Sequence, residues 1–119
     1  MTARRYVFKV LSRSQWDAAC REGAFVGSAD DLRDGFIHLS LRSQLPGTLA
    51  KHFRGQADLV LIQFAARDLG GNLRWEPSRG GEEFPHLYGA LATALAVSVH
   101  TLQPGEDGVP QLPEDFAAC

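Results

Sequence analysis

Runs of apolar residues divide this chain into alternating strands and helices. Residues 6–11 combine β-branched and aromatic side chains, which predicts a strand. Residues 58–65 contain an almost unbroken apolar run, which is typical of a central strand covered on both faces. Residues 73–76 predict a short strand that ends before a proline, and residues 95–102 predict a final strand.

Two other stretches have the spacing of amphipathic helices. Ser12 and Gln15 are spaced as a capping box, and Trp16, Ala19 and Cys20 behind them share one helical face. We therefore expect a helix that buries this face, including the thiol. A second helix is predicted over residues 44–54, where its apolar stripe consists of Leu45, Leu49 and Phe53.

The order of strand, helix, strand, helix and then mostly strands predicts an α+β fold. We expect curved mixed or antiparallel sheets with two or three short helices packed on them. Residues 1–103 are expected to form a single compact domain, which is long enough to bury a core without disulfides. Residues 104–119 contain three prolines and are expected to form a tail along the surface.

The composition narrows the classes of partner. A net charge of -2 gives no general attraction to nucleic acid or to an anionic membrane. No apolar run approaches the ~20 residues that span a bilayer. Cys20 and Cys119 are too few and too far apart for a disulfide framework, so we expect a cytoplasmic protein. A small molecule is the expected partner, and the sequence leaves the oligomeric state open.

His38 lies midway along residues 35–40, a predicted strand in which Ile37 and Leu39 flank it. A histidine in this setting is either a core residue bonded to backbone or an acid–base or ligand-binding residue of a site. The sequence favours the two interpretations equally. Histidine titrates closest to neutral pH, so a neighbouring carboxylate or modest burial tunes it readily.

Glu76 and His86 also have two interpretations each. Glu76 follows Trp75, and an apolar ring beside a carboxyl group tends to raise its pKa, whereas an ionised Glu76 would stabilise a developing sugar cation. His86 and Tyr88 share one side of an extended segment that Pro85 stiffens. The alternatives are an exposed strand-end glutamate and a structural plug.

Taken together, these positions predict one concave pocket lined by His38, Glu76 and His86, with Trp75 or Tyr88 on its wall. An unpaired buried polar group costs ~1–3 kcal/mol, so each of them needs a partner or a ligand. Two histidines and a glutamate are also a known zinc set, but no close-spaced pair of ligands anchors one here. We therefore predict no metal.

The motifs in this order resemble the domain-of-unknown-function 952 family of small bacterial and plant proteins. The resemblance covers nearly the whole chain and rests on residues 35–40, Gln44 and Thr48, residues 52–53, residues 74–76 and residues 84–89. It implies a fold similar to the ADP-ribosyltransferase superfamily, a split α+β structure around an NAD cleft. It further implies that His38 holds the ribose or nicotinamide side of the ligand. Glu76 is the nearest candidate for the glutamate that stabilises the positive sugar.

The resulting hypothesis is a small enzyme that acts on NAD, an ADP-ribosyl group or a related nucleotide, as an ADP-ribosyltransferase-like transferase or glycohydrolase. No cofactor is required, since NAD would be a substrate. The predicted catalytic residues are His38, Glu76 and His86, and the predicted ligand-binding residues are Ser40, Gln44, Thr48, Trp75 and Tyr88. The alternative is a non-catalytic module that binds a small metabolite or nucleotide in the same cleft. Leu39 favours it, because histidine-bearing members of the superfamily usually carry a small residue there.

Overall fold

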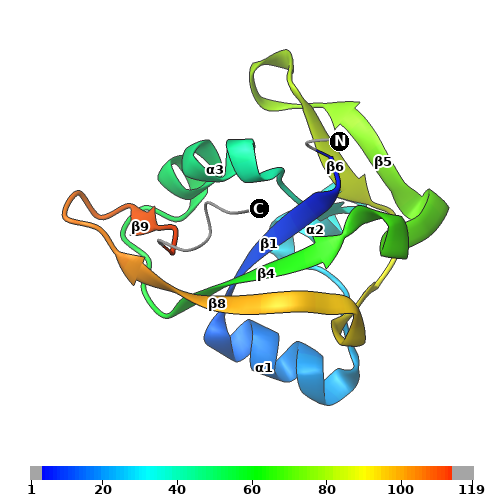
Figure 1. The fold of residues 1–119 in the computed structure, drawn as a ribbon, viewed down its shortest axis with the longest axis horizontal. Coiled ribbons are helices and arrows are strands. Elements are labelled where there is room, and N and C mark those ends of the chain that lie inside the picture. Colours follow the sequence, from blue (N-terminus) through cyan, green and yellow to red (C-terminus); the bar gives the residue numbers. More distant parts are fainter. Residues whose placement is uncertain (1–3, 114–119) are drawn as a thin grey trace.

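The computed structural model describes residues 4–113, and its largest sheet has four antiparallel strands (Figure 1). Their order is β1 (Tyr6–Ser12), β4 (Leu59–Ala65), β8 (Ala96–Pro104) and β9 (Pro110–Gln111). Every residue of β4 is buried, as expected for a continuous apolar strand between two covered faces.

Two smaller antiparallel sheets complete the strands. One pairs β2 (Ala24–Phe25) with β7 (Leu91–Ala92). The other places β6 (Glu83–Leu87) between β3 (Ile37–His38) and β5 (Leu73–Pro77). All strand pairs within residues 4–113 are antiparallel. The predicted α+β class is therefore confirmed.

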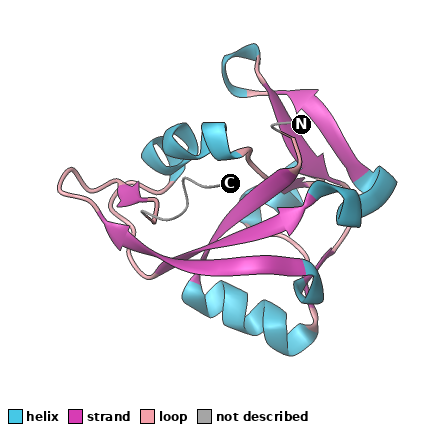
Figure 2. Ribbon diagram, viewed as in Figure 1, coloured by secondary structure: helices cyan, strands magenta, loops and turns pink. Residues whose placement is uncertain are grey.

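In the described residues, three α-helices and four short 3-10 helices connect the strands, and Figure 2 shows the helices in cyan. The helices are α1 (Arg13–Glu22), α2 (Ala29–Asp34) and α3 (Leu45–His52), and the turns are η1 (Arg42–Gln44), η2 (Ala66–Asn72), η3 (Arg79–Gly81) and η4 (Thr93–Leu95). No helix in the described part of the chain is long and apolar enough to cross a membrane.

The helices α1 and α3 pack on opposite faces of the four-stranded sheet. Alternate residues of β1 point to opposite faces of the sheet, so its neighbouring side chains contact different helices. Val7 packs in one core cluster with Trp16 of α1, whereas Phe8 packs in a second cluster with Leu45 of α3. The predicted capping box starts α1. Cys20, which we expected to be buried, is exposed, because α1 turns only the narrower face of Trp16 and Ala19 to the sheet.

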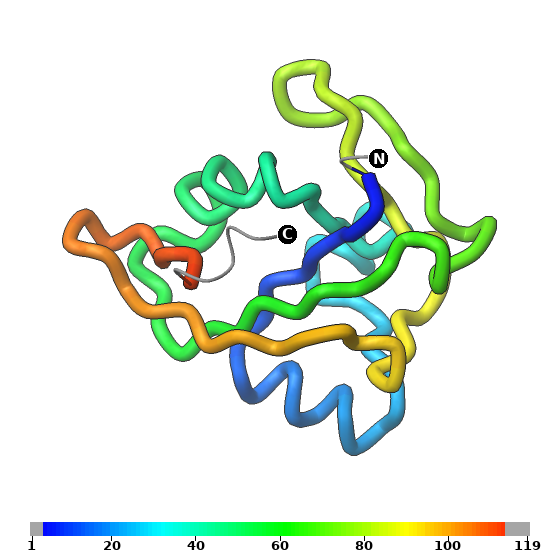
Figure 3. The backbone as a smooth tube through the Cα atoms, viewed as in Figure 1, coloured from blue at the N-terminus to red at the C-terminus, as the bar shows by residue number. Residues whose placement is uncertain are grey.

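The chain after residue 103 was expected to form a tail along the surface, and its described part, up to residue 113, folds back beside β8 and α3. β9 pairs with the end of β8, and Val109 and Leu112 pack against the core cluster of α3. Figure 3 shows this return beside α3, where the tube changes from orange to red. The remainder of the predicted tail, residues 114–119, lies outside the described residues.

The three-stranded sheet has one apolar face and one polar face. Ile37 of β3 is opposed to Leu87 of β6, and both are buried in the core cluster of α1. The next pair along is His38 opposed to His86. Since neighbouring residues of a strand point to opposite faces, the two histidines share the face that is turned away from this core.

Candidate functional site

A cavity of about 320 Å³ lies at the polar face of the three-stranded sheet. It is lined from β1, α2, β3, α3, η3 and β6, which contribute Lys9, Asp31, His38, Thr48, Arg79 and His86 among others. Its volume falls at the lower end of the ~300–1,000 Å³ that small-molecule sites occupy. The molecule therefore has room for part of a nucleotide-sized ligand beside both histidines.

The carboxylate of Asp31 holds His38 in place. Asp31 Oδ1 accepts a hydrogen bond from the backbone N–H of His38 at 3.0 Å and lies 2.6 Å from the ring Nδ1. Asp31 reaches this position because its Oδ2 also accepts the N–H of Ser28 at 3.0 Å, which caps α2. Gly35 then ends α2 at a φ of 86°, a left-handed conformation that suits glycine and turns the chain into β3.

Lys9 completes the surroundings of Asp31. Its Nζ lies 3.0 Å from Asp31 Oδ2 and 2.9 Å from the backbone carbonyl oxygen of His38. The side chains of Lys9 and Asp31 are both buried. Burial alone would raise the pKa of Asp31, but the hydrogen bonds from His38 and the charge of Lys9 outweigh it and hold the pKa well below its usual value. Burial lowers the pKa of Lys9, and the attraction of Asp31 offsets part of this shift.

The second ring nitrogen of His38 faces another carboxylate. Asp34 Oδ2 lies 2.9 Å from His38 Nε2. A hydrogen bond from Arg33 is the main reason that the pKa of Asp34 is lowered, and the attraction of His38 adds to it. Because Asp31 and Asp34 are both ionised at neutral pH, a protonated His38 donates to a carboxylate from each side.

His86 is held by Glu76, in a similar way. His86 is buried, and its Nδ1 lies 2.7 Å from Glu76 Oε1, which also accepts the Tyr88 hydroxyl at 2.8 Å. The hydrogen bonds from His86 and Tyr88 lower the pKa of Glu76. The hydrogen bond between Tyr88 and Glu76 also raises the pKa of Tyr88. Because an ionised carboxylate accepts the Nδ1 proton, Nε2 of a neutral His86 keeps its lone pair.

The two histidine rings belong to one aromatic cluster. Their centroids are 5.7 Å apart at an angle of 70°. Phe36 stacks on His86 with a centroid distance of 4.0 Å and lies 4.6 Å from the ring of His38. The rings are therefore fixed close enough for one small group of a ligand to meet both of them.

Glu76 is brought to His86 but is not one of the residues that line the cavity. Its neighbour across the sheet is Phe84, so it reaches His86 diagonally, along the shared face. The sequence placed Glu76 in the pocket itself. The geometry instead favours a positioning role, in which Glu76 orients the ring of His86 and Tyr88 helps to orient Glu76.

The predicted ligand-binding residues fall in different places. Ser40 and Thr48 both line the cavity, and their hydroxyl oxygens are 3.0 Å apart. Trp75 points to the opposite face of its sheet from Glu76 and packs against the core cluster of α1, with the guanidinium of Arg4 4.4 Å from its ring. A ligand role for Ser40 and Thr48 stays a prediction, whereas Trp75 is placed away from the cavity.

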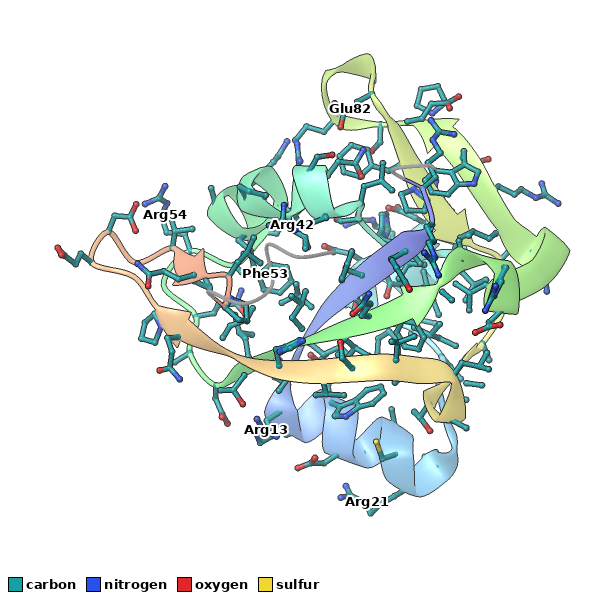
Figure 4. All side chains as sticks on the ribbon, viewed as in Figure 1. Arg13, Arg21, Arg42, Phe53, Arg54 and Glu82 are labelled. Carbon is teal, nitrogen blue, oxygen red and sulfur yellow. The ribbon has the colours of Figure 1, made fainter. Side chains whose placement is uncertain are left out.

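Gln44 is buried and joins two parts of the chain. Its side-chain Oε1 accepts the backbone N–H of Leu41 at 2.8 Å, and its side-chain Nε2 donates to Glu82 Oε1 and to the backbone carbonyl of Glu83, both at 2.7 Å. Figure 4 shows Glu82 at the end of the β5–β6 hairpin that approaches α3. Gln44 therefore fastens this hairpin to the start of α3.

Comparison with known proteins places the chain in a family. The sequence profile of the family Protein of unknown function (DUF952) matches residues 10–99. The chain belongs to the DUF952 family. No curated protein matches it.

The fold is similar to that of the protein CC0527 from Caulobacter crescentus. Its crystal structure has 52% sequence identity and a TM-score of 0.91, over 96% of this chain and 99% of that chain. Its solution NMR structure has 50% identity and a TM-score of 0.85, over 97% and 99% of the two chains. This DUF952 chain and CC0527 therefore share one fold along nearly their whole length.

Sequence reasoning missed Asp31 and Lys9 as parts of the site, although each carries a signal. Lys9 is the one charged residue within the apolar strand of residues 6–11. A buried lysine needs an anionic partner. Asp31 follows Ser28 by three residues, which is the spacing of a helix cap.

Among residues 4–113, no group of three or more His, Cys, Asp or Glu side chains is arranged to hold a metal ion.

The contact between Glu76 and Tyr88 gives a direct test of this geometry. Glu76→Gln removes the negative charge beside the phenol, so the raised pKa of Tyr88 should fall towards the ordinary value for tyrosine. Spectrophotometric titration can follow this change, because the chain contains only two tyrosines, Tyr6 and Tyr88. Tyr88→Phe identifies which transition belongs to Tyr88. An unchanged Tyr88 transition in Glu76→Gln would show that the two side chains are not in contact.

Proposed function

We propose that this DUF952 protein is a small enzyme with an ADP-ribosyltransferase-like fold that acts on NAD, an ADP-ribosyl group or a related nucleotide. The main support is the pair of carboxylate-held histidines at one cavity, His38 and His86, on opposed positions of neighbouring strands. Their environments differ, since His38 lies between two carboxylates and His86 contacts one. Two titratable groups in different settings suit an acid–base division of labour.

In the proposed reaction His86 is the general base. A water molecule or acceptor hydroxyl transfers its proton to Nε2 of His86 while its oxygen bonds to the sugar carbon. The bond between sugar and nicotinamide breaks, and nicotinamide leaves as a neutral molecule with the electron pair of that bond. With water as the acceptor, NAD gives ADP-ribose, nicotinamide and one proton.

The charges of the cavity support a ligand that carries both signs. Asp30 and Asp34 line it from α2, and Lys51 and Arg79 line it from α3 and η3. NAD combines a cationic nicotinamide ring with an anionic diphosphate. The carboxylate of Asp34, which lies against His38, takes the role of stabilising the sugar cation that the sequence assigned to Glu76.

NAD and ADP-ribose titrations test this proposal. We expect millimolar NAD to shift the NMR signals of the His38 and His86 rings. On incubation, nicotinamide and ADP-ribose should accumulate in equal amounts. Ring shifts without nicotinamide release would support the non-catalytic binding module instead. Unmoved ring signals at millimolar NAD would exclude NAD as the ligand.

A further inference from the structure

Two cations at the cavity have no ionic partner within the described residues. Lys9 and Arg33 also line it, but both bond carboxylates of α2. Lys51 and Arg79 form no ion pair with any residue in the described range of 4–113. Their charges therefore remain available to an anionic ligand.

Arg79 is nevertheless held in a defined place. Its Nη2 donates a long hydrogen bond of 3.4 Å to the carbonyl of Gln44, and its guanidinium carbon lies 4.9 Å from the centroid of the Phe84 ring. It passes so close to Gly47 of α3 that a Cβ at that position would lie 2.8 Å from Nη2. With one N–H used, most of the five donors of the guanidinium stay free, on a group that is already oriented.

Hydroxyl groups and a second cation line the cavity together with Arg79. Thr48 and Ser78 line the same cavity. Lys51 lines it too. Partial desolvation and then the charges of Lys51 and Arg79 lower the pKa of His52, against the attraction of Asp30. The C-terminal dipole of α3 opposes an anion here, but hydrogen bonds from charged donors are stronger than this dipole.

We propose that Arg79 and Lys51 bind the phosphate groups of a nucleotide ligand, Arg79 through its planar donors and Lys51 as a point charge. This inference rests on the proposed function, because it orients the ligand within the same cavity. The phosphates lie at α3 and η3, and the sugar lies at His38 and His86.

Calorimetric titration with pyrophosphate and with ADP-ribose, at one fixed salt concentration, tests this site. Arg79→Ala should weaken the binding of both ligands by about tenfold or more, the loss expected for a hydrogen bond from a charged donor. Lys51→Ala should weaken it by about two- to fivefold, because Lys51 is exposed. Arg21→Ala is the matched control, since Arg21 lies on α1, away from α3 (Figure 4), and should change neither affinity.

Gly47→Ala moves Arg79 without replacing it. The added Cβ displaces the end of a flexible side chain, and a helix accommodates alanine better than glycine. We expect weaker pyrophosphate binding with a midpoint of urea unfolding that is unchanged or raised. If pyrophosphate fails to bind at millimolar concentration, or binds Arg79→Ala as well as the unmodified protein, the phosphate site is excluded.

These results separate the phosphate site from the proposed enzyme. If nicotinamide is released from NAD but Arg79→Ala does not change pyrophosphate binding, the phosphate site is excluded and the proposed enzyme activity is supported. If Arg79→Ala weakens pyrophosphate binding but no nicotinamide is released, the phosphate site is supported and the proposed enzyme activity is excluded.

Discussion

His86→Gln should lower the rate of nicotinamide release from saturating NAD by about 10²–10⁴-fold, the contribution typical of a positioned general base. His86 meets the requirements of that role, because its Nδ1 contacts an ionised Glu76 and its ring lines the cavity. Glutamine can still donate a hydrogen bond to Glu76 but offers no basic nitrogen. Nicotinamide quantified by chromatography over time gives the rate.

A second histidine provides the control for this experiment. His100 lies on β8, opposed to Leu61, and does not line the cavity. His100→Gln should therefore leave the rate of nicotinamide release unchanged. If His86→Gln retains the full rate while its urea unfolding is normal, His86 is not the base.

The periodicity of the sequence predicts which residues share a strand face but not which strands pair. Residues 35–40 were expected to be a strand, and Ile37 and Leu39 are buried as the alternation requires. Only Ile37–His38 form regular pairs, both with β6. The closeness of His38 and His86 follows from this register. Register depends on contacts between segments that are far apart in sequence. Local patterns could therefore identify the two histidines as candidates but could not predict that they face each other on neighbouring strands.

The position of Glu76 shows the same limit at the level of one side chain. The sequence predicts that Glu76 and His86 lie near each other, and the two side chains are in contact. Whether a carboxylate enters a cavity or supports a neighbouring ring depends on the diagonal geometry between β5 and β6. That geometry brings Glu76 to Nδ1 of His86 and leaves it outside the lining of the cavity. The carboxylates that line the cavity come from α2 instead.

Asp31→Asn should lower the free energy of unfolding by about 3–5 kcal/mol, because it leaves the charge of Lys9 buried without its anion. Asparagine keeps the shape of the side chain, so the loss would come from charge and hydrogen bonds, not from packing. The variant also weakens the cap of α2 and the support of His38, since both use the same carboxylate. Urea unfolding at neutral pH, followed by circular dichroism, measures the difference.

The control and the pH dependence identify the cause. Asp30→Asn removes an exposed carboxylate one residue away, which pairs with Arg33 at the surface, and should cost less than about 1 kcal/mol. Adding Lys9→Met to Asp31→Asn should recover part of the loss, because no buried charge then lacks a partner.

The pKa of Asp31 is lower in the folded than in the unfolded protein, so its stabilisation is complete above about pH 4 and declines as the pH falls further. Asp31→Asn should therefore flatten the acid side of the stability curve, and an Asp31→Asn protein as stable as Asp30→Asn would show that the buried pair contributes nothing.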